Sequence, residues 1–301
     1  MAERDAAMHI AVFGAGSLGS LLGGLLAGSH TVTLVGREPE MKAVASGGLR
    51  VTGELERTVH PATTTDWSGV ADPDLVLVTV KSYDTDAVAS QLARDPPSTI
   101  LTLQNGIGPA ETLAERLPKS TVLTGTVTYG ARLEEPGVVA CTGQGDVVIG
   151  AVDGGPAPAA ASIVSAFEGV GIPTRHEPAF PRERWRKLAV NAAINPLTAL
   201  AGVSNGAVNE TPLQPIAVGI AHEVAAVARS QGVDLPDGIA ERAVLEVASR
   251  TAANESSMAR DLRRGQRTEI DAITGSVLRR ANGVAVPMNE VLYALVMAAD
   301  S

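Results

Sequence analysis

Short apolar runs alternate with helix-like stretches along the first half of the chain. The apolar runs that predict β-strands are 8–13, 31–35, 74–80, 99–104 and 121–127. The intervening segments that predict helices are 17–28, 84–93 and 107–117. Repeated β-α units of this kind favour a parallel sheet covered by helices. The run at 74–80 is apolar almost throughout, which is typical of a strand buried on both faces.

The pattern changes beyond residue 128. Turn residues between 135 and 145 separate two β-rich runs, which predicts an antiparallel hairpin at a sheet edge. Residues 151–161 predict a loop that enters a helix, and 170–178 predict a last strand. The rest of the chain is helical in pattern almost to its end. Because 301 residues suffice for two domains, we predict an α/β domain over 1–178 and an all-α domain over 179–301.

A glycine-rich string follows the first predicted strand. Its members are Gly14, Ala15, Gly16, Ser17, Leu18 and Gly19. It opens a helix, with Ser17 expected as the N-cap, and a second strand follows, which makes a G-x-G-x-x-G specific for dinucleotides. The glycines permit a tight turn, close approach of a pyrophosphate and close helix packing, while the helix N-terminus attracts phosphate. We therefore predict a Rossmann-type cofactor domain; a glycine-rich turn of another α/β protein is the alternative.

The end of the second predicted strand bears on cofactor choice. An NAD enzyme usually has Asp or Glu there, about 20 residues on, for the ribose 2′-OH. This chain has Gly36 and Arg37 instead, and an Arg can hold the 2′-phosphate of NADP bidentately. Lys81 and Asn105 follow the next two strands, where such sheets bind ligands. We expect NADP(H), with a merely solvated Arg37 as the alternative.

A polar stripe crosses the first helix of the second domain. Lys187, Asn191 and Asn195 stand at i, i+4 and i+8 and share one helix face, while their neighbours are apolar or small. Each buried polar group without a partner costs about 1–3 kcal/mol, so the stripe predicts a ligand site, with a structural hydrogen-bond network or a solvated stripe as the alternatives. Pro196 predicts a kink beside Asn195.

A second polar group lies near the end of the chain, at 254–257 and 267–271. Ile270, Ile273 and Val277 form a helical apolar stripe, and Glu269 borders it one turn before Ile273. A carboxylate there could meet Lys187. It could equally stabilise the first turn of a helix through the helix dipole.

Composition excludes several classes of function. The net charge of −9 argues against nucleic acid and anionic membranes as partners. No apolar run approaches the ~20 residues of a membrane span, and the acidic first seven residues, expected as a loose tail, do not form a signal peptide. We therefore expect a cytoplasmic protein. The lone Cys141 and five scattered histidines predict no disulfide and no metal site, and a homodimer is compatible with the sequence.

With these segments identified, the chain resembles the ketopantoate reductase (2-dehydropantoate 2-reductase) family over nearly its whole length. The matching segments are GAGSLG at 14–19, Lys81, QNGIG at 104–108, GARLEEPG at 130–137, WRKLAVNAAINPLTAL at 185–200, NESSMARDL at 254–262 and RTEIDAITG at 267–275. The last three, in this order, are specific to that family.

The resemblance implies NADPH-dependent reduction of a small 2-oxo acid, ketopantoate, to pantoate, a step of pantothenate and coenzyme A biosynthesis. It implies that Lys187 is the general acid and that Glu269 holds the substrate hydroxyl and that lysine. The residues that it implies for the substrate are Asn105, Asn191, Asn195 and Ser257, and those for the cofactor are the 14–19 loop, Arg37, Lys81 and again Asn105. A protonated lysine could stabilise and protonate the developing alkoxide.

Two other functions stay open. A different NADP-dependent 2-oxo-acid or imine reductase could share the same two-domain plan, because fold does not fix substrate. The 3-hydroxy-acid dehydrogenases usually have K-x-x-N, however, rather than the K-x-x-x-N formed by Lys187 and Asn191. A non-catalytic NADP sensor would have no need of both Lys187 and Glu269.

Overall fold

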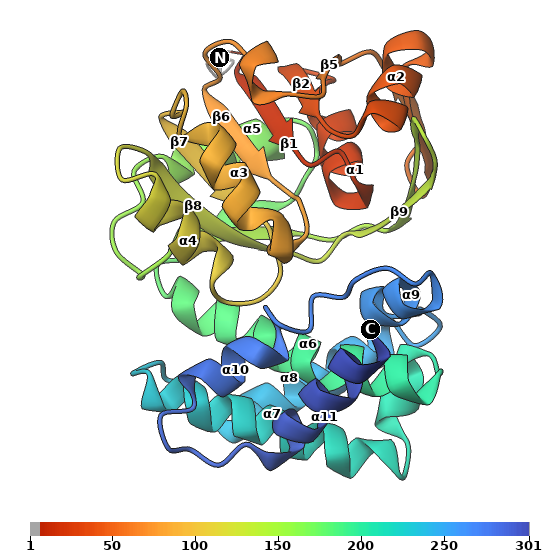
Figure 1. Ribbon diagram of the computed structural model, residues 1–301, viewed down its shortest axis with the longest axis vertical. Coiled ribbons are helices and arrows are strands. Elements are labelled where there is room, and N and C mark those ends of the chain that lie inside the picture. Colours follow the sequence, from red (N-terminus) through yellow and green to blue (C-terminus); the bar gives the residue numbers. More distant parts are fainter. Residues whose placement is uncertain (1–6, 301) are drawn as a thin grey trace. The chain divides into compact units, whose positions relative to one another are not determined.

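The computed structural model describes residues 7–300 and therefore leaves residues 1–6 of the expected N-terminal tail outside the description. The chain divides into two compact units. The first holds the chain up to Gln104 together with Pro109–Phe180, and the second holds Asn105–Gly108 together with the chain from Pro181 onward. Each unit is described by itself below, and Figure 1 shows their elements.

The first unit is built on an eight-stranded sheet. In spatial order its strands are β12 (Thr174–His176), β11 (Val147–Ala151), β8 (Thr121–Val127), β7 (Thr99–Thr102), β6 (Leu75–Val78), β1 (His9–Phe13), β2 (Thr31–Val35) and β5 (Ala62–Thr64). The strands from β8 to β5 are parallel, and β11 is antiparallel to β8. The strand order reverses between β1 and β6, and ligands of such sheets bind at the carboxyl ends beside that point. The predicted Rossmann-type fold class is confirmed.

Helices cover both faces of this sheet. They are α1 (Ser17–Leu26), α2 (Glu38–Gly47), α3 (Thr85–Leu92), α4 (Pro109–Arg116) and α5 (Ala160–Glu168), with short 3-10 helices at Trp67–Gly69 and Ser82–Asp84. Because successive strand residues point to opposite faces, Ile10 and Val12 of β1 pack with α1 and α5, whereas Ala11 and Phe13 pack with α3 and α4. Figure 1 shows α3 and α4 together on one face.

A second sheet has the order β4 (Arg57–Val59), β3 (Leu49–Gly53), β10 (Val138–Gly143) and β9 (Gly130–Glu135). The predicted antiparallel hairpin at a sheet edge is confirmed, because β9 pairs antiparallel with β10 and is the edge strand of this sheet. Strand β3 pairs in parallel with β10 and so places the hairpin in a sheet separate from the main one.

Helix α1 lies between the two sheets. A Cβ on Gly23 would lie 2.7 Å from Cδ2 of Leu34 in the main sheet, and one on Gly24 would lie 2.8 Å from Cγ2 of Val51 in the second. A helix that is apolar all round suits this position, because both of its faces are buried.

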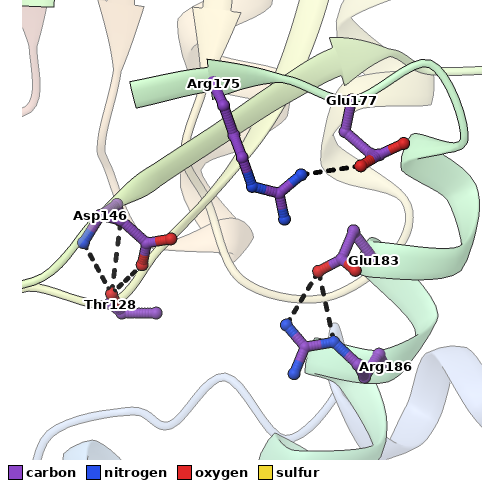
Figure 2. Close-up of polar contacts among 6 residues, drawn as sticks. All are labelled: Thr128, Asp146, Arg175, Glu177, Glu183 and Arg186. Atoms are coloured by element: carbon purple, nitrogen blue, oxygen red, sulfur yellow. Dashed lines mark hydrogen bonds and ion pairs between the residues drawn. The ribbon is translucent and has the colours of Figure 1, made fainter. Parts of the chain in front are cut away.

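Polar contacts fix the strand ends at the far edge of the main sheet (Figure 2). Thr128 Oγ1 accepts the Asp146 amide N–H at 2.8 Å and also binds the Asp146 carboxylate, which holds the corner between β8 and β11. Arg175 of β12 donates to Glu177 at 2.7 Å. The Asp146 and Arg175 contacts are exposed, so they contribute little to stability and mainly fix local geometry.

The second unit is helical. Its helices are α6 (Phe180–Ala201, of which Phe180 belongs to the first unit), α7 (Leu213–Ser230), α8 (Asp237–Arg250), α9 (Ser257–Arg263), α10 (Thr274–Arg280) and α11 (Pro287–Ala299), with a 3-10 helix at Asn205–Asn209. Their shared core is made almost wholly of Ala, Val, Leu and Ile. Near the start of α6, Arg186 donates to Glu183 at 2.8 and 3.2 Å (Figure 2). Helix α6 continues through Pro196 to Ala201, and the kink at this proline stays a prediction.

Candidate active site

The glycine-rich loop joins β1 to α1 at the carboxyl ends of the main strands. Gly14 has a φ of 111°, and a Cβ there would lie 2.6 Å from the backbone nitrogen of Val80. A Cβ on Gly19 would lie 2.1 Å from the carbonyl oxygen of Gly14. At Gly16, in contrast, no atom lies within 4 Å of an added Cβ. Two glycines thus permit close packing, and the third faces open space beside the start of α1.

The N-terminus of α1 is capped differently from the prediction. The N-cap is Gly16, and Ser17 is the first helical residue, so its expected capping role is wrong. The Ser17 hydroxyl instead accepts the Leu133 amide N–H of β9 at 3.0 Å, which ties the helix to the second sheet. Since no side chain of the described residues caps α1, its first amides suit an anionic ligand. Leu18 is half-buried in this first turn.

Arg37 stands directly after β2, beside the loop. The amides of Gly14 and Ala15 donate to the carbonyl of Val35 at 2.9 and 3.2 Å, and a Cβ on Gly36 would lie 2.9 Å from that of Ala15. The Arg37 side chain is 81% exposed and lies 3.4 Å from Glu40. The guanidinium is therefore open to solvent, whereas the Glu40 side chain that it contacts is only 13% exposed.

Lys81 and Gln104 lie after β6 and β7. Gln104 is buried, and its amide donates to the carbonyl of Lys81 at 3.3 Å and to Thr85 at 2.9 Å, while it accepts from Thr102 at 2.9 Å. Gln104 thus holds these two loops in register, a structural role that sequence reasoning missed. Lys81 itself is half-buried at the start of the 3-10 helix.

Asn105 and Glu269 meet within the second unit. The Asn105 amide donates to Oε2 of Glu269 at 3.1 Å, and Glu269 is only 6% exposed. Glu269 lies in a turn that precedes α10, where its carbonyl accepts the Ile273 amide N–H at 3.0 Å. Because α10 begins at Thr274, Glu269 is not in its first turn, which removes the reading based on the helix dipole.

The predicted polar stripe is present on α6. Lys187 and Asn191 are half-buried, and Asn195 is 8% exposed. Among the described residues of the second unit, neither asparagine amide has a hydrogen-bond partner. A structural network would pair these amides, so their state speaks against that alternative and fits a ligand site or a solvated stripe.

Comparison with known proteins agrees with this arrangement. The family model described as Ketopantoate reductase PanE/ApbA matches residues 10–154, and its C-terminal counterpart matches residues 179–300. The chain belongs to the ketopantoate reductase family. It is therefore an oxidoreductase, and the resemblance inferred from its motifs is confirmed.

The similarity to ketopantoate reductases extends over almost the whole chain. The chain is 45% identical to the 2-dehydropantoate 2-reductase of Halobacterium salinarum, over 97% of this chain and 99% of the relative. The PanE/ApbA family ketopantoate reductase of Ralstonia eutropha JMP134 superposes with a TM-score of 0.90 at 34% identity, over 97% of this chain and 98% of that one. A D-mandelate dehydrogenase crystallised with NADH and anilino(oxo)acetate has a TM-score of 0.91 at 24% identity, over 97% of this chain and 98% of that one, and shares the fold.

Two adjacent serines at the start of α9 differ in burial and in hydrogen bonding. Ser257, predicted for the substrate, is exposed at the start of α9. Ser256 is buried and caps α9 by accepting the Ala259 amide N–H at 3.2 Å, and its Oγ lies 2.8 Å from the hydroxyl of Thr198 on α6. The preference for serine at a helix N-cap could have identified Ser256, but its contact with α6 is tertiary and leaves no local signal.

Three asparagines outside the stripe form hydrogen bonds within the second unit. Asn205 donates to Thr251 at 3.0 Å, Asn209 donates to Ser249 at 2.7 Å, and the carbonyl of Asn254 accepts the Asn205 amide N–H. An open hollow of about 650 Å³ lies here, lined by Asn209, Gln214, Leu245, Glu246, Ser249 and Arg250, none of them a predicted site residue.

Asp271 stabilises the turn that carries Glu269. It accepts from Arg279 at 2.8 Å and from the Tyr293 hydroxyl at 3.1 Å. Burial raises the pKa of Asp271, but the hydrogen bonds and the Arg279 charge outweigh it and hold that pKa below its usual range. Within residues 7–300, no group of three His, Cys, Asp or Glu side chains could hold a metal ion, and no helix is long and apolar enough to cross a membrane.

Proposed function

We propose that the chain catalyses the NADPH-dependent reduction of ketopantoate to pantoate, with Lys187 as the general acid. The stripe on α6 carries the proposal, because it places the ammonium group of Lys187 and the side-chain amides of Asn191 and Asn195 on one helix face. The 45% identity to a 2-dehydropantoate 2-reductase over almost the whole chain supports the choice of substrate.

The residues of the first unit fit a dinucleotide. The open space at Gly16 and the uncapped start of α1 suit a pyrophosphate, and Arg37 and Lys81 supply positive charge at the ends of β2 and β6. An exposed Arg at the end of β2, in place of a carboxylate, favours NADPH over NADH. When bound, NADPH supplies the hydride for the C2 carbonyl carbon.

The residues of the second unit suit the 2-oxo acid. Negative charge develops on the C2 oxygen during reduction, and the Lys187 ammonium would stabilise it and then donate a proton to that oxygen. The amides of Asn191 and Asn195 can donate to the substrate carboxylate and oxo group. Glu269 can accept a hydrogen bond from a substrate hydroxyl, with Asn105 holding the carboxylate in place.

The decisive experiment follows NADPH absorbance with ketopantoate as the substrate. Lys187→Ala should lower kcat by about 10²- to 10⁴-fold, the contribution of a positioned general acid. The exposed Lys119→Ala serves as a matched control and should retain wild-type kcat. Turnover of 2-oxoisovalerate but not of ketopantoate would refute the substrate, and full activity in Lys187→Ala would refute the general acid.

Cofactor choice is tested separately. Arg37→Ala should lower the preference for NADPH over NADH, measured as a ratio of kcat/KM values, by about 10- to 100-fold, the worth of charged hydrogen bonds to a phosphate. Arg116→Ala is the control, because Arg116 is also exposed and pairs with an acid, Asp86. A wild-type enzyme that uses both cofactors equally would contradict the NADPH assignment.

A further inference from the structure

Gly106 makes an unusually close backbone contact in the second unit. Its φ is 86°, and a Cβ built on it would lie 2.1 Å from the carbonyl oxygen of Ala272 and 2.6 Å from the carbonyl carbon. Real Cβ atoms essentially never approach another atom within 3.0 Å. Because the obstacle is backbone, no rotation of a side chain can relieve it.

Two hydrogen bonds flank this contact. On one side of Gly106, the Asn105 amide donates to Oε2 of Glu269 at 3.1 Å. On the other, the Ile107 amide N–H donates to the carbonyl of Ala272 at 3.2 Å. Both acceptors belong to the single turn 269–272, so the segment 105–107 lies flat against that turn.

We propose that Gly106 is a positioning residue: its missing side chain lets the 105–107 segment close on the 269–272 turn and thereby holds the Asn105 amide on the Glu269 carboxylate. The effect on turnover rests on the proposed function, in which Glu269 binds the substrate hydroxyl. Gly106 touches no reacting atom and acts through Asn105 and Glu269.

A Cβ at position 106 would force the two backbones apart by about 1 Å. A hydrogen bond of 3.1 Å that is lengthened by this amount is lost. The Asn105 amide would then no longer hold Oε2 of the Glu269 carboxylate in place. Displacements of about 1 Å in positioning groups can cost about 100-fold in rate.

The test compares Gly106→Ala with Gly108→Ala. Both glycines have positive φ, 86° and 135°, but a Cβ on Gly108 would meet nothing within 4 Å. Both variants therefore carry backbone strain, and only the first collides with Ala272. Gly106→Ala should lower kcat/KM for ketopantoate by about 10- to 100-fold, and Gly108→Ala by less than about 3-fold.

A double-mutant cycle distinguishes positioning from a general structural effect. If Gly106 acts through Asn105, then Gly106→Ala should cost little further activity in an Asn105→Ala background. Equal losses in both backgrounds would overturn the proposal, and so would equal losses in Gly106→Ala and Gly108→Ala.

Hydrogen exchange keeps the proposal testable if Gly106→Ala does not fold. In the wild-type protein, the Ile107 amide should be protected from exchange, because it donates to Ala272. Exchange of this amide at the rate of an open loop would overturn the proposal. A wild-type protein that protects Ile107 but does not reduce ketopantoate would refute the proposed function and leave this packing of Gly106 supported.

Discussion

The glycine-rich loop at 14–19 and the polar stripe on α6 differ in the groups that are expected to meet a ligand. In the loop, side chains are missing where backbone must come close, as at Gly14 and Gly19, and the ligand is expected to meet amide N–H groups. In the stripe, side chains carry the chemistry, and the amides of Asn191 and Asn195 have no partner among the described residues of their unit. Close backbone packing therefore defines the first region, whereas polar side chains on one helix face define the second.

We therefore expect substitutions in the loop and in the stripe to affect stability and activity differently. Altering the loop at its packed glycines should harm the fold and cofactor binding together, because the backbone contacts serve both. Altering the stripe amides should harm activity alone, because they have no hydrogen-bond partner among the described residues of their unit.

The largest effect is expected at Gly19. In Gly19→Ala the new Cβ would collide with the carbonyl of Gly14, so we expect the free energy of unfolding to fall by about 3 kcal/mol and NADPH binding to be lost. Gly16→Ala is the matched control, because its Cβ enters open space: it should unfold at the wild-type temperature and bind NADPH more weakly. Thermal unfolding and NADPH titration measure the two effects. Equal destabilisation by both substitutions would contradict the distinction between the packed Gly19 and the open Gly16.

The next effect is expected at Asn195. Asn195→Leu keeps the size of the side chain and removes its amide, so kcat/KM should fall by about 10- to 100-fold while the free energy of unfolding changes by less than about 1 kcal/mol. Asn205→Leu is the control, since Asn205 is also 8% exposed but donates to Thr251. It should destabilise the protein and leave kcat/KM unchanged. A loss of stability in Asn195→Leu would show that the amide has a structural role.

A smaller effect is expected where the stripe helix is anchored. Thr198→Val keeps the shape of the side chain and removes the hydroxyl that lies 2.8 Å from Ser256, so the protein should lose about 1 kcal/mol in denaturant unfolding. Thr198→Ser should restore that stability. Because the link supports α6 and α9 without touching the stripe amides, kcat should change by less than about 3-fold. A large fall in kcat with normal stability would place Thr198 in the site.

Local signals explain which parts of the fold could be predicted. The strands at 9–13, 31–35 and 121–127 lie where the apolar runs predicted them, and the glycine loop joins the first of them to α1. Each signal sits within a few residues of the structure that it specifies. The same holds for the stripe on α6, because helical periodicity alone aligns Lys187 with Asn191 and Asn195.

Contacts between distant segments could not be predicted. The strands of 49–64 are short, and the pairing of β3 with β10 joins residues about ninety positions apart. The assignment of 105–108 to the second unit depends on the contact of Gly106 with Ala272. Ser17 and Ser256 each bind a group from another element, so the sequence around them shows the serine but not its partner.

The smallest effect is expected in the rate at which a thiol reagent labels Cys141, a residue of the core that α1 packs against. This thiol is 1% exposed in β10, and burial raises its pKa, so little reactive thiolate forms in the folded protein. A thiol reagent should label it at least about 100-fold more slowly than in the unfolded chain, because labelling requires opening of the structure. Gly19→Ala should speed this labelling, since α1 packs on the sheet that contains β10, whereas Gly16→Ala should not. Fast labelling in Gly16→Ala would mean that the open side of the loop is also coupled to the core. The expectation that only the packed glycines of the loop affect the fold would then be wrong.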